Sequence, residues 1–158
     1  MSRRSTRIAL VLGALVGFLA ISAILARVLT ANEAERARVL RLLRAEAAGD
    51  ARAATGLVPG CAAAASCSVP LRSLTARLGA AGRVEVLSYE PATHFSLGGT
   101  RGVGRVAWRI GTGAPIVQCV GVHRTGDPFG GLGVQLTAVS SPIGGEASCP
   151  SEAARLKR

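Results

Sequence analysis

Several residue types on which common protein chemistries depend are scarce in this chain. Phe, Trp and Tyr together make up only 3% of its 158 residues, too few to form the stacking platforms that bind single-stranded nucleic acids. There are two histidines and nine acids, and no Gly-x-Ser-x-Gly, His-Glu-x-x-His or paired-carboxylate motif is present. The sequence therefore predicts no catalytic residue, no metal ligand, no cofactor and no nucleic-acid partner, and it favours a protein that is not an enzyme.

Acidic residues are also few compared with basic ones. Nineteen bases oppose nine acids, which gives a formal charge of +10. Arg3, Arg4 and Arg7 precede the apolar N-terminal run and Arg27 lies in its end, so the rest of the chain carries fifteen bases against nine acids, a formal charge of +6. This charge suits an anionic lipid headgroup or an envelope polymer better than it suits DNA or RNA.

One long apolar run stands near the N-terminus. It begins at Ile8 and ends at Leu29, which is close to the ~20 residues that a helix needs to cross the hydrocarbon of a bilayer. A cleaved signal peptide is the alternative, because the basic N-terminus and the small residues Ala20 and Ser22 resemble a cleavage site. The apolar run continues past that site, so an uncleaved membrane anchor is favoured. Both interpretations export the rest of the chain.

The number of flanking arginines barely decides the orientation of this helix, because three precede it and four follow it (Arg36, Arg38, Arg41 and Arg44), but their distance from the apolar run favours one orientation. Three arginines adjoin its N-terminal end, whereas the arginines of segment 36–44 begin several residues beyond its other end. We therefore expect the N-terminus to be cytoplasmic and the C-terminal domain extracytoplasmic. The expected divisions are a cytoplasmic tail (1–7), a single transmembrane helix (8–29), an extracytoplasmic domain (30–142) and a C-terminal tail (143–158).

Four cysteines, Cys61, Cys67, Cys119 and Cys149, agree with an oxidising compartment. None lies in C-x-x-C or zinc-ligand spacing, so two disulfides are expected. Cys61 and Cys67 enclose a short segment and favour a local bridge. Cys119 then pairs with Cys149, provided that the tail after Pro142 folds back over the strand that carries Cys119.

The remaining pattern predicts an α+β domain, in which helices pack on a curved antiparallel sheet. Asn32 can cap a helix that runs to about Ala48, and Asp50 can cap a shorter one. The predicted helices are 32–48, 51–57 and 69–78, and the predicted strands are 84–89, 103–110, 116–124 and 132–140. In the expected register Trp108 faces Gln118 and Val122 faces Val134, so one face of the sheet is apolar.

This order of elements resembles the nuclear transport factor 2-like (SnoaL-like) cone fold, in a membrane-anchored bacterial version. The residues that carry the resemblance are VLRLLRAEAAGDARAATGL (39–57) and the strand series 103–140. Enzymes of that family place a catalytic Asp or His inside the cone. No position of this chain matches such a residue, so the resemblance implies a fold and no activity.

Two sets of polar residues are the candidates for chemistry. His94 in a loop and His123 on a strand could transfer protons, although loop and surface histidines usually have no such role. Arg101, Arg105 and Arg109 recur every four residues on one strand face and are candidate anion-binding residues. A solvated strand face also explains these arginines and is the favoured interpretation, because the whole chain is rich in Arg.

Two functions follow from this pattern. The favoured one is a single-pass, non-catalytic binding or assembly module of the cell envelope, with a protein, lipid or polymer partner. The alternative is a small-ligand carrier or enzyme that uses the interior of the cone. A cavity with converging polar groups would favour the alternative, whereas a filled interior favours a partner surface.

Overall fold

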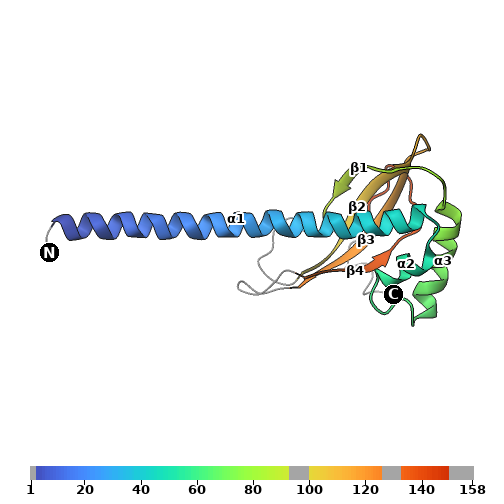
Figure 1. The fold of residues 1–158 in the computed structure, drawn as a ribbon, viewed down its shortest axis with the longest axis horizontal. Coiled ribbons are helices and arrows are strands. Elements are labelled where there is room, and N and C mark those ends of the chain that lie inside the picture. The colour runs from blue at the N-terminus through green and yellow to red at the C-terminus, as the bar shows by residue number, and fades with distance from the viewer. Residues whose placement is uncertain (1–2, 93–99, 126–132, 150–158) are drawn as a thin grey trace.

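The computed structural model describes residues 3–92, 100–125 and 133–149, which form an α+β domain on a long helix (Figure 1). The described strands form one antiparallel sheet in the order β1-β2-β3-β4. The described elements are α1 (Arg3–Ala47), α2 (Ala51–Gly56), α3 (Ala65–Leu78), β1 (Val84–Glu90), β2 (Thr100–Ile110), β3 (Ile116–Thr125) and β4 (Gly133–Val139).

Helix α1 is one continuous helix of 45 residues, about 68 Å long at 1.5 Å per residue. The prediction that a new helix starts at an Asn32 cap is therefore wrong. No Gly or Pro interrupts this region, and the hydroxyl of Thr30 donates to the carbonyl of Ala26 one turn earlier. The side chain of Asn32 accepts a hydrogen bond from Arg124, 2.9 Å away, and so does not cap the helix.

The ends of the helices follow their sequence signals closely. Gly49 has φ +70°, a left-handed conformation that glycine adopts without strain, and it ends α1 as expected. The Asp50 carboxylate accepts from the Ala53 N–H at 2.9 Å and caps α2, also as expected. Helix α3 begins at Ala65, four residues before the predicted start, so Ser68 is a buried helical residue.

All four strands are present with bounds close to those predicted, but both predicted registers are wrong, by two residues at Trp108 and at Val122 and by three at Val120, which pairs with Val139 and not with Leu136. Trp108 pairs with Ile116, and Val122 pairs with Leu136. The first hairpin closes through a longer loop than expected, and the β3–β4 register shifts between Gly121 and Val122. A shift of two residues keeps every side chain on its face, so the predicted apolar face is nevertheless the buried one.

The core lies where the second half of α1 crosses this apolar face (Figure 1). Leu42 and Leu43 of α1 are fully buried, as are Trp108 and Val120 of the sheet. Helices α2 and α3 close the end of this layer (Figure 1). The interior between helix and sheet is thus filled by large side chains.

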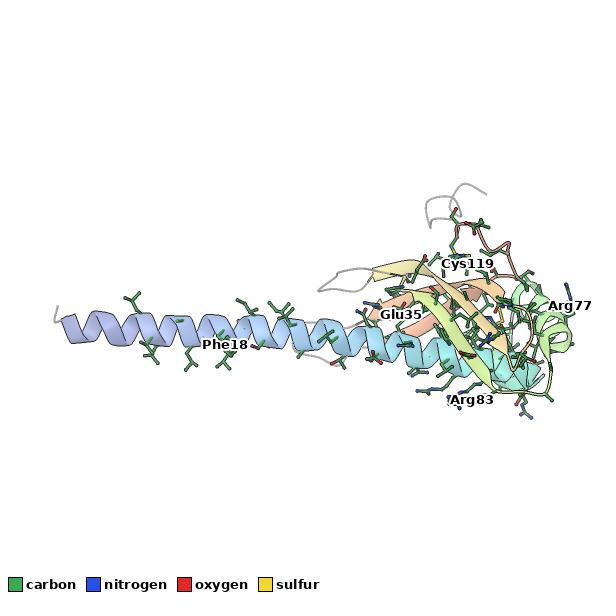
Figure 2. All side chains as sticks on the ribbon, turned by 90° about the horizontal axis from the view of Figure 1, so that it is seen from above. Phe18, Glu35, Arg77, Arg83 and Cys119 are labelled. Atoms are coloured by element: carbon green, nitrogen blue, oxygen red, sulfur yellow. A yellow bond between two sulfur atoms is a disulfide. The ribbon has the colours of Figure 1, made fainter. Side chains whose placement is uncertain are left out.

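The first half of α1 projects away from the domain (Figure 1). Apolar side chains are exposed along it, among them Leu10, Phe18 and Leu29 (Figure 2). Among the described residues, no helix is sufficiently long and apolar to span a membrane. The two disulfides that the structure contains are typical of an extracytoplasmic or secreted domain.

Candidate functional site

The most unusual feature of the interior is a pair of buried carboxylates, Glu35 and Glu46. Both side chains belong to α1, and neither residue has exposed surface. They are eleven residues apart, about three helical turns or 16 Å along the axis, so both face the sheet. Ionised carboxylates are costly to bury without partners. Their surroundings therefore determine what this site can do.

The Glu35 carboxylate has partners for both of its oxygens. Arg124, itself only 5% exposed, donates from Nε to Oε2 at 2.7 Å. The Tyr89 hydroxyl and the Ala92 N–H, the latter at 3.0 Å, donate to Oε1. Burial raises the pKa of Tyr89 well above its usual range, and the hydrogen bond and negative charge of Glu35 raise it further. Tyr89 is therefore a hydrogen-bond donor at physiological pH.

This Glu35 network joins α1 to both β1 and β3 at the point where the sheet begins to cover the helix (Figure 2). A buried ion pair offsets its desolvation only when the remaining hydrogen-bonding groups are satisfied. Here the Arg124 guanidinium also donates to Asn32 at 2.9 Å, which ties the pair to the preceding turn of α1. The network fixes the direction in which the exposed half of α1 leaves the domain.

The Glu46 carboxyl is only half satisfied. Gln118 donates from Nε2 to Oε2 of Glu46 at 3.1 Å and accepts at Oε1 from the Trp108 indole at 2.6 Å. Within the described residues, Oε1 of Glu46 has no hydrogen-bond partner. Burial raises the pKa of Glu46 to about 7, although the Gln118 hydrogen bond lowers it in part. The carboxyl therefore exchanges its proton near neutral pH.

A carboxyl with such a pKa has the acid–base property that proton-transfer catalysis requires. It also needs a substrate within hydrogen-bonding reach. Glu46 has no exposed surface, and the large side chains of Trp108, Leu42 and Leu43 share the interior with it. In the described structure, Glu46 is therefore a titratable group enclosed in the core, out of reach of a ligand at the surface.

The three arginines predicted as an anion site, Arg101, Arg105 and Arg109, differ in their partners and in their exposure. Arg105 donates to the carbonyls of Gly145 and Ala147, and its Nη1 lies 3.5 Å from Glu90. Arg109 holds the Glu85 carboxylate at 2.7–2.8 Å. Arg101 is exposed. Two of the three guanidinium groups are therefore occupied by the protein's own oxygens.

Of the two candidate histidines, the structure describes His123 alone. His123 is half-buried on the outer face of β3 and pairs in register with Arg101. His94 lies outside the described residues. Within the described ranges, no three His, Cys, Asp or Glu residues approach closely enough to hold a metal ion.

Both disulfides connect the cysteines that the sequence pairs. Cys61 is linked to Cys67, and Cys119 to Cys149. Residues 140–143 run beside β3, where the Ile143 N–H donates to the Val117 carbonyl at 2.8 Å, and residues 145–149 then contact Arg105 and Cys119 on the outer face. Cys119 is consequently fully buried on a face that would otherwise be exposed. A bridge that closes about thirty residues typically stabilises a fold by ~2–4 kcal/mol.

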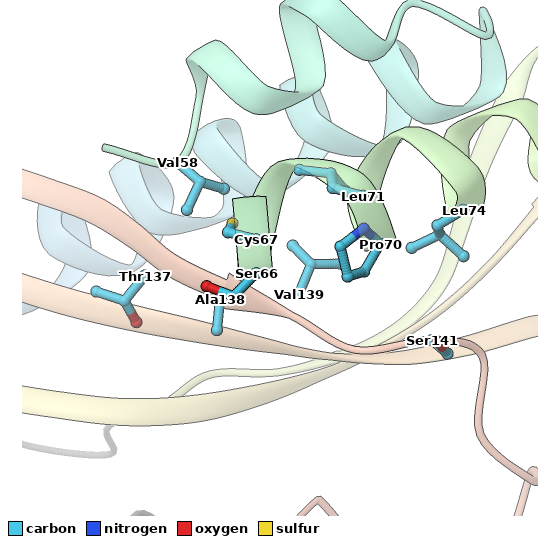
Figure 3. Close-up of a pocket in the computed structure, with 10 residues that line it drawn as sticks. All are labelled: Val58, Ser66, Cys67, Pro70, Leu71, Leu74, Thr137, Ala138, Val139 and Ser141. Carbon is cyan, nitrogen blue, oxygen red and sulfur yellow. The ribbon is translucent and has the colours of Figure 1, made fainter. Parts of the chain in front are cut away.

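Hollows of the surface lie around the edges of the domain. One of about 230 Å³ separates α3 from β4 and is lined by Pro70, Leu71 and Val139 among others (Figure 3). One of about 590 Å³ lies between α2 and α3. A third, of about 660 Å³, lies between α1 and β1 and contains Arg36, Arg44 and Arg83. Neither buried carboxylate lines any of these three grooves.

Sequence reasoning missed the interior polar residues, although a signal for Glu46 was available. Val39, Leu42 and Leu43 form the buried stripe of α1, and Glu46 lies three residues beyond Leu43 on the same stripe. Glu35 lies one turn before Val39. An acid on an apolar helical stripe predicts a buried carboxylate with partners on the facing element.

Comparison of the chain with known proteins identifies no relative. No family model, no curated protein and no solved structure matches it. The resemblance to the nuclear transport factor 2-like fold therefore stays a prediction.

Proposed function

We propose that this chain is a single-pass, membrane-anchored extracytoplasmic domain that acts as a non-catalytic binding or assembly module of the cell envelope. The observation that carries the proposal is the exposed apolar half of α1, which is continuous with the half that forms the domain core.

The exposed half of α1 has the surface of a helix adapted to lipid. Its large apolar side chains are between 39% and 69% exposed. They are Leu10, Val11, Leu12, Leu15, Val16, Phe18, Leu19, Ile21, Ile24, Leu25 and Leu29. Because consecutive residues take part, they cover all sides of the helix, a pattern that suits a hydrocarbon environment and not a single core-facing stripe. In the sequence, Ile8 and Ala9 extend the run toward the ~20 residues of a spanning helix.

A continuous helix holds the domain at a defined position. Residues 30–47 of α1 extend about 27 Å beyond Leu29, and the Glu35 network locks this part to the sheet. The domain surface therefore keeps one orientation to the bilayer, unlike a domain on a flexible linker. Such an arrangement suits a module that presents a surface to a partner.

The placement outside the cytoplasm is supported by two separate features. Arg3, Arg4 and Arg7 adjoin the apolar run on its N-terminal side, which favours a cytoplasmic N-terminus. The two disulfides are stable in an oxidising compartment. Release after signal cleavage would export the same domain without its anchor.

The non-catalytic part of the proposal is supported by the filled interior. The buried carboxylates contact protein partners, whereas the described grooves lie at the edges of the sheet. One observation favours the alternative of a small-ligand carrier or enzyme. The unpartnered oxygen of Glu46 could bind a ligand group if the interior opened.

A topology experiment tests the proposal. A reporter that is active only in the cytoplasm, fused after Arg158, should remain silent, and a periplasm-active reporter at the same site should be active. The full chain should stay with membranes after alkaline carbonate extraction. Val16→Arg should release it, whereas the matched variant Val16→Leu should not. A strong cytoplasmic signal, or release of the unmodified chain by carbonate, would contradict the proposal.

A further inference from the structure

The groove between α1 and β1 contains three arginines, compared with two in the groove between α2 and α3 and none in the groove between α3 and β4. Its walls include Arg36, Leu40 and Arg44 from α1 and Val84 and Val86 from β1, and Arg83 lies at the entry to β1 (Figure 2). All three arginines are exposed. The ion pairs among the described residues are made by other arginines, namely Arg105, Arg109 and Arg124.

The single acid in this groove is already neutralised. Glu85 lines it, but its Oε2 accepts from Arg109 at 2.7–2.8 Å. The three groove arginines therefore produce a positive field over apolar walls. Such a surface fits a ligand that combines several anionic groups with apolar or backbone contacts.

The groove also contains the free side of an edge strand. Among the described strands, β1 is the first of the sheet and pairs only with β2. The Gly111 N–H donates to the Arg83 carbonyl at 2.9 Å, so the polar backbone groups of Arg83 point toward β2. Because hydrogen-bonding direction alternates along an antiparallel strand, the backbone groups of Val84 and Val86 point away from β2, toward the groove.

We propose that this groove binds an extended, acidic segment of a partner polypeptide, which pairs with β1 as an additional strand. Its backbone bonds to Val84 and Val86, and its carboxylates contact Arg36, Arg44 and Arg83. Arg36 and Arg44 are eight residues apart, about 12 Å along α1, which four residues of an extended strand also cover. This inference deepens the proposed function, because it names the partner class of the binding module.

A peptide explains the groove better than a lipid or a polyphosphate does. Arg44 lies fifteen residues beyond Leu29, about 22 Å along the helix, and so stands clear of the headgroup layer of a bilayer spanned by the proposed anchor. A polyphosphate would use the guanidinium groups alone. It would leave the outward backbone groups of Val84 and Val86 and the apolar wall at Leu40 without a role.

The test uses the full chain in micelles of an uncharged detergent. The probe is a short, fluorescent, end-capped peptide of alternating Glu and Thr, compared with its Lys-Thr counterpart and with an N-methylated version that cannot pair as a strand. We expect the Glu-Thr peptide alone to bind, with an affinity that falls as salt rises. Arg44→Gln and Arg83→Gln should each weaken it roughly 2- to 5-fold. Arg41→Gln, an exposed arginine outside the groove, is the matched control and should change nothing.

A second variant tests the strand pairing directly. Val86→Pro removes an outward N–H without removing a bond to β2, so it should abolish peptide binding while circular dichroism shows an intact fold. If that variant does not fold, the N-methylated peptide answers the same question on the unaltered chain.

Equal binding of the N-methylated peptide, or binding of polyphosphate alone, would show a general polyanion surface and overturn the proposal. No binding of the Glu-Thr peptide would overturn it too. Binding in micelles is independent of membrane orientation, so this outcome and that of the topology test are separable.

Discussion

The two halves of α1 share one backbone conformation but have opposite environments. In the first half apolar side chains cover the whole circumference and are exposed, whereas in the second half they form one stripe that is buried under the sheet. The border between them lies near Glu35, whose network attaches the helix to β1 and β3. The comparison shows that the distribution of apolar residues around a helix, and not helix formation itself, decides where the domain begins.

Glu35→Ala should have the largest effect on this border. It leaves Arg124 buried without its carboxylate, and removal of one partner from a buried ion pair typically costs about 3–5 kcal/mol. Glu33→Ala is the matched control, because Glu33 is exposed two residues earlier on the same helix, and it should change stability by less than about 0.5 kcal/mol. Urea unfolding in micelles measures both. Equal stabilities of the two variants would show that the network does not hold α1 to the sheet.

Truncation of one leucine in each half tests the comparison itself. Leu42→Ala creates a cavity in the core and should lower the free energy of unfolding of the domain by about 2–5 kcal/mol. Leu15→Ala, in the exposed half, should leave domain stability within about 0.5 kcal/mol. Chemical denaturation followed by Trp108 fluorescence distinguishes them. A comparable loss in Leu15→Ala would mean that the first half of α1 packs on the domain.

Glu46, in the buried half of α1, should make the stability of the domain depend on pH. Its pKa rises from 4.5 to about 7 on folding, so between these values the folded state binds the proton and the unfolded state does not. Stability should therefore fall as pH rises from 4.5 to 7, by up to about 3 kcal/mol, and then level off. Glu46→Gln should remove this slope and stabilise the domain at pH 8, whereas Glu33→Gln should keep the slope. An unchanged slope in Glu46→Gln would assign the dependence to another group.

The smallest expected effect on stability comes from two arginines on the outer face of the sheet, the partly buried Arg105 and the exposed Arg101. Arg105→Gln loses contacts to the carbonyls of Gly145 and Ala147 and should cost about 1 kcal/mol, together with faster amide exchange in residues 140–149. Arg101→Gln should cost less than about 0.5 kcal/mol, because Arg101 is exposed. Hydrogen exchange of the two variants, compared residue by residue, checks this difference. Equal protection of the tail in both would remove Arg105 from its attachment.

Much of the fold could be predicted because its signals are local. The Gly49 end of α1, the Asp50 cap of α2 and the alternation of the strands depend on neighbouring residues only. The disulfide pairing also followed from short-range spacing and from the face on which Cys119 lies. The start of α3 and the break expected at Asn32 were wrong, because a capping residue permits a helix start but does not require one.

By itself, the sequence determined the apolar run at the N-terminus, the α+β order of elements, the buried face of the sheet and the pairing of the cysteines. Only the tertiary structure decided the strand register, the burial of Glu35 and Glu46, and the basic groove beside β1. Those features depend on which residues meet across elements far apart in the chain. A two-residue slip leaves the periodicity of a strand unchanged. The partners of a buried carboxylate, and the charge beside a sheet edge, exist only once helix and sheet have packed together.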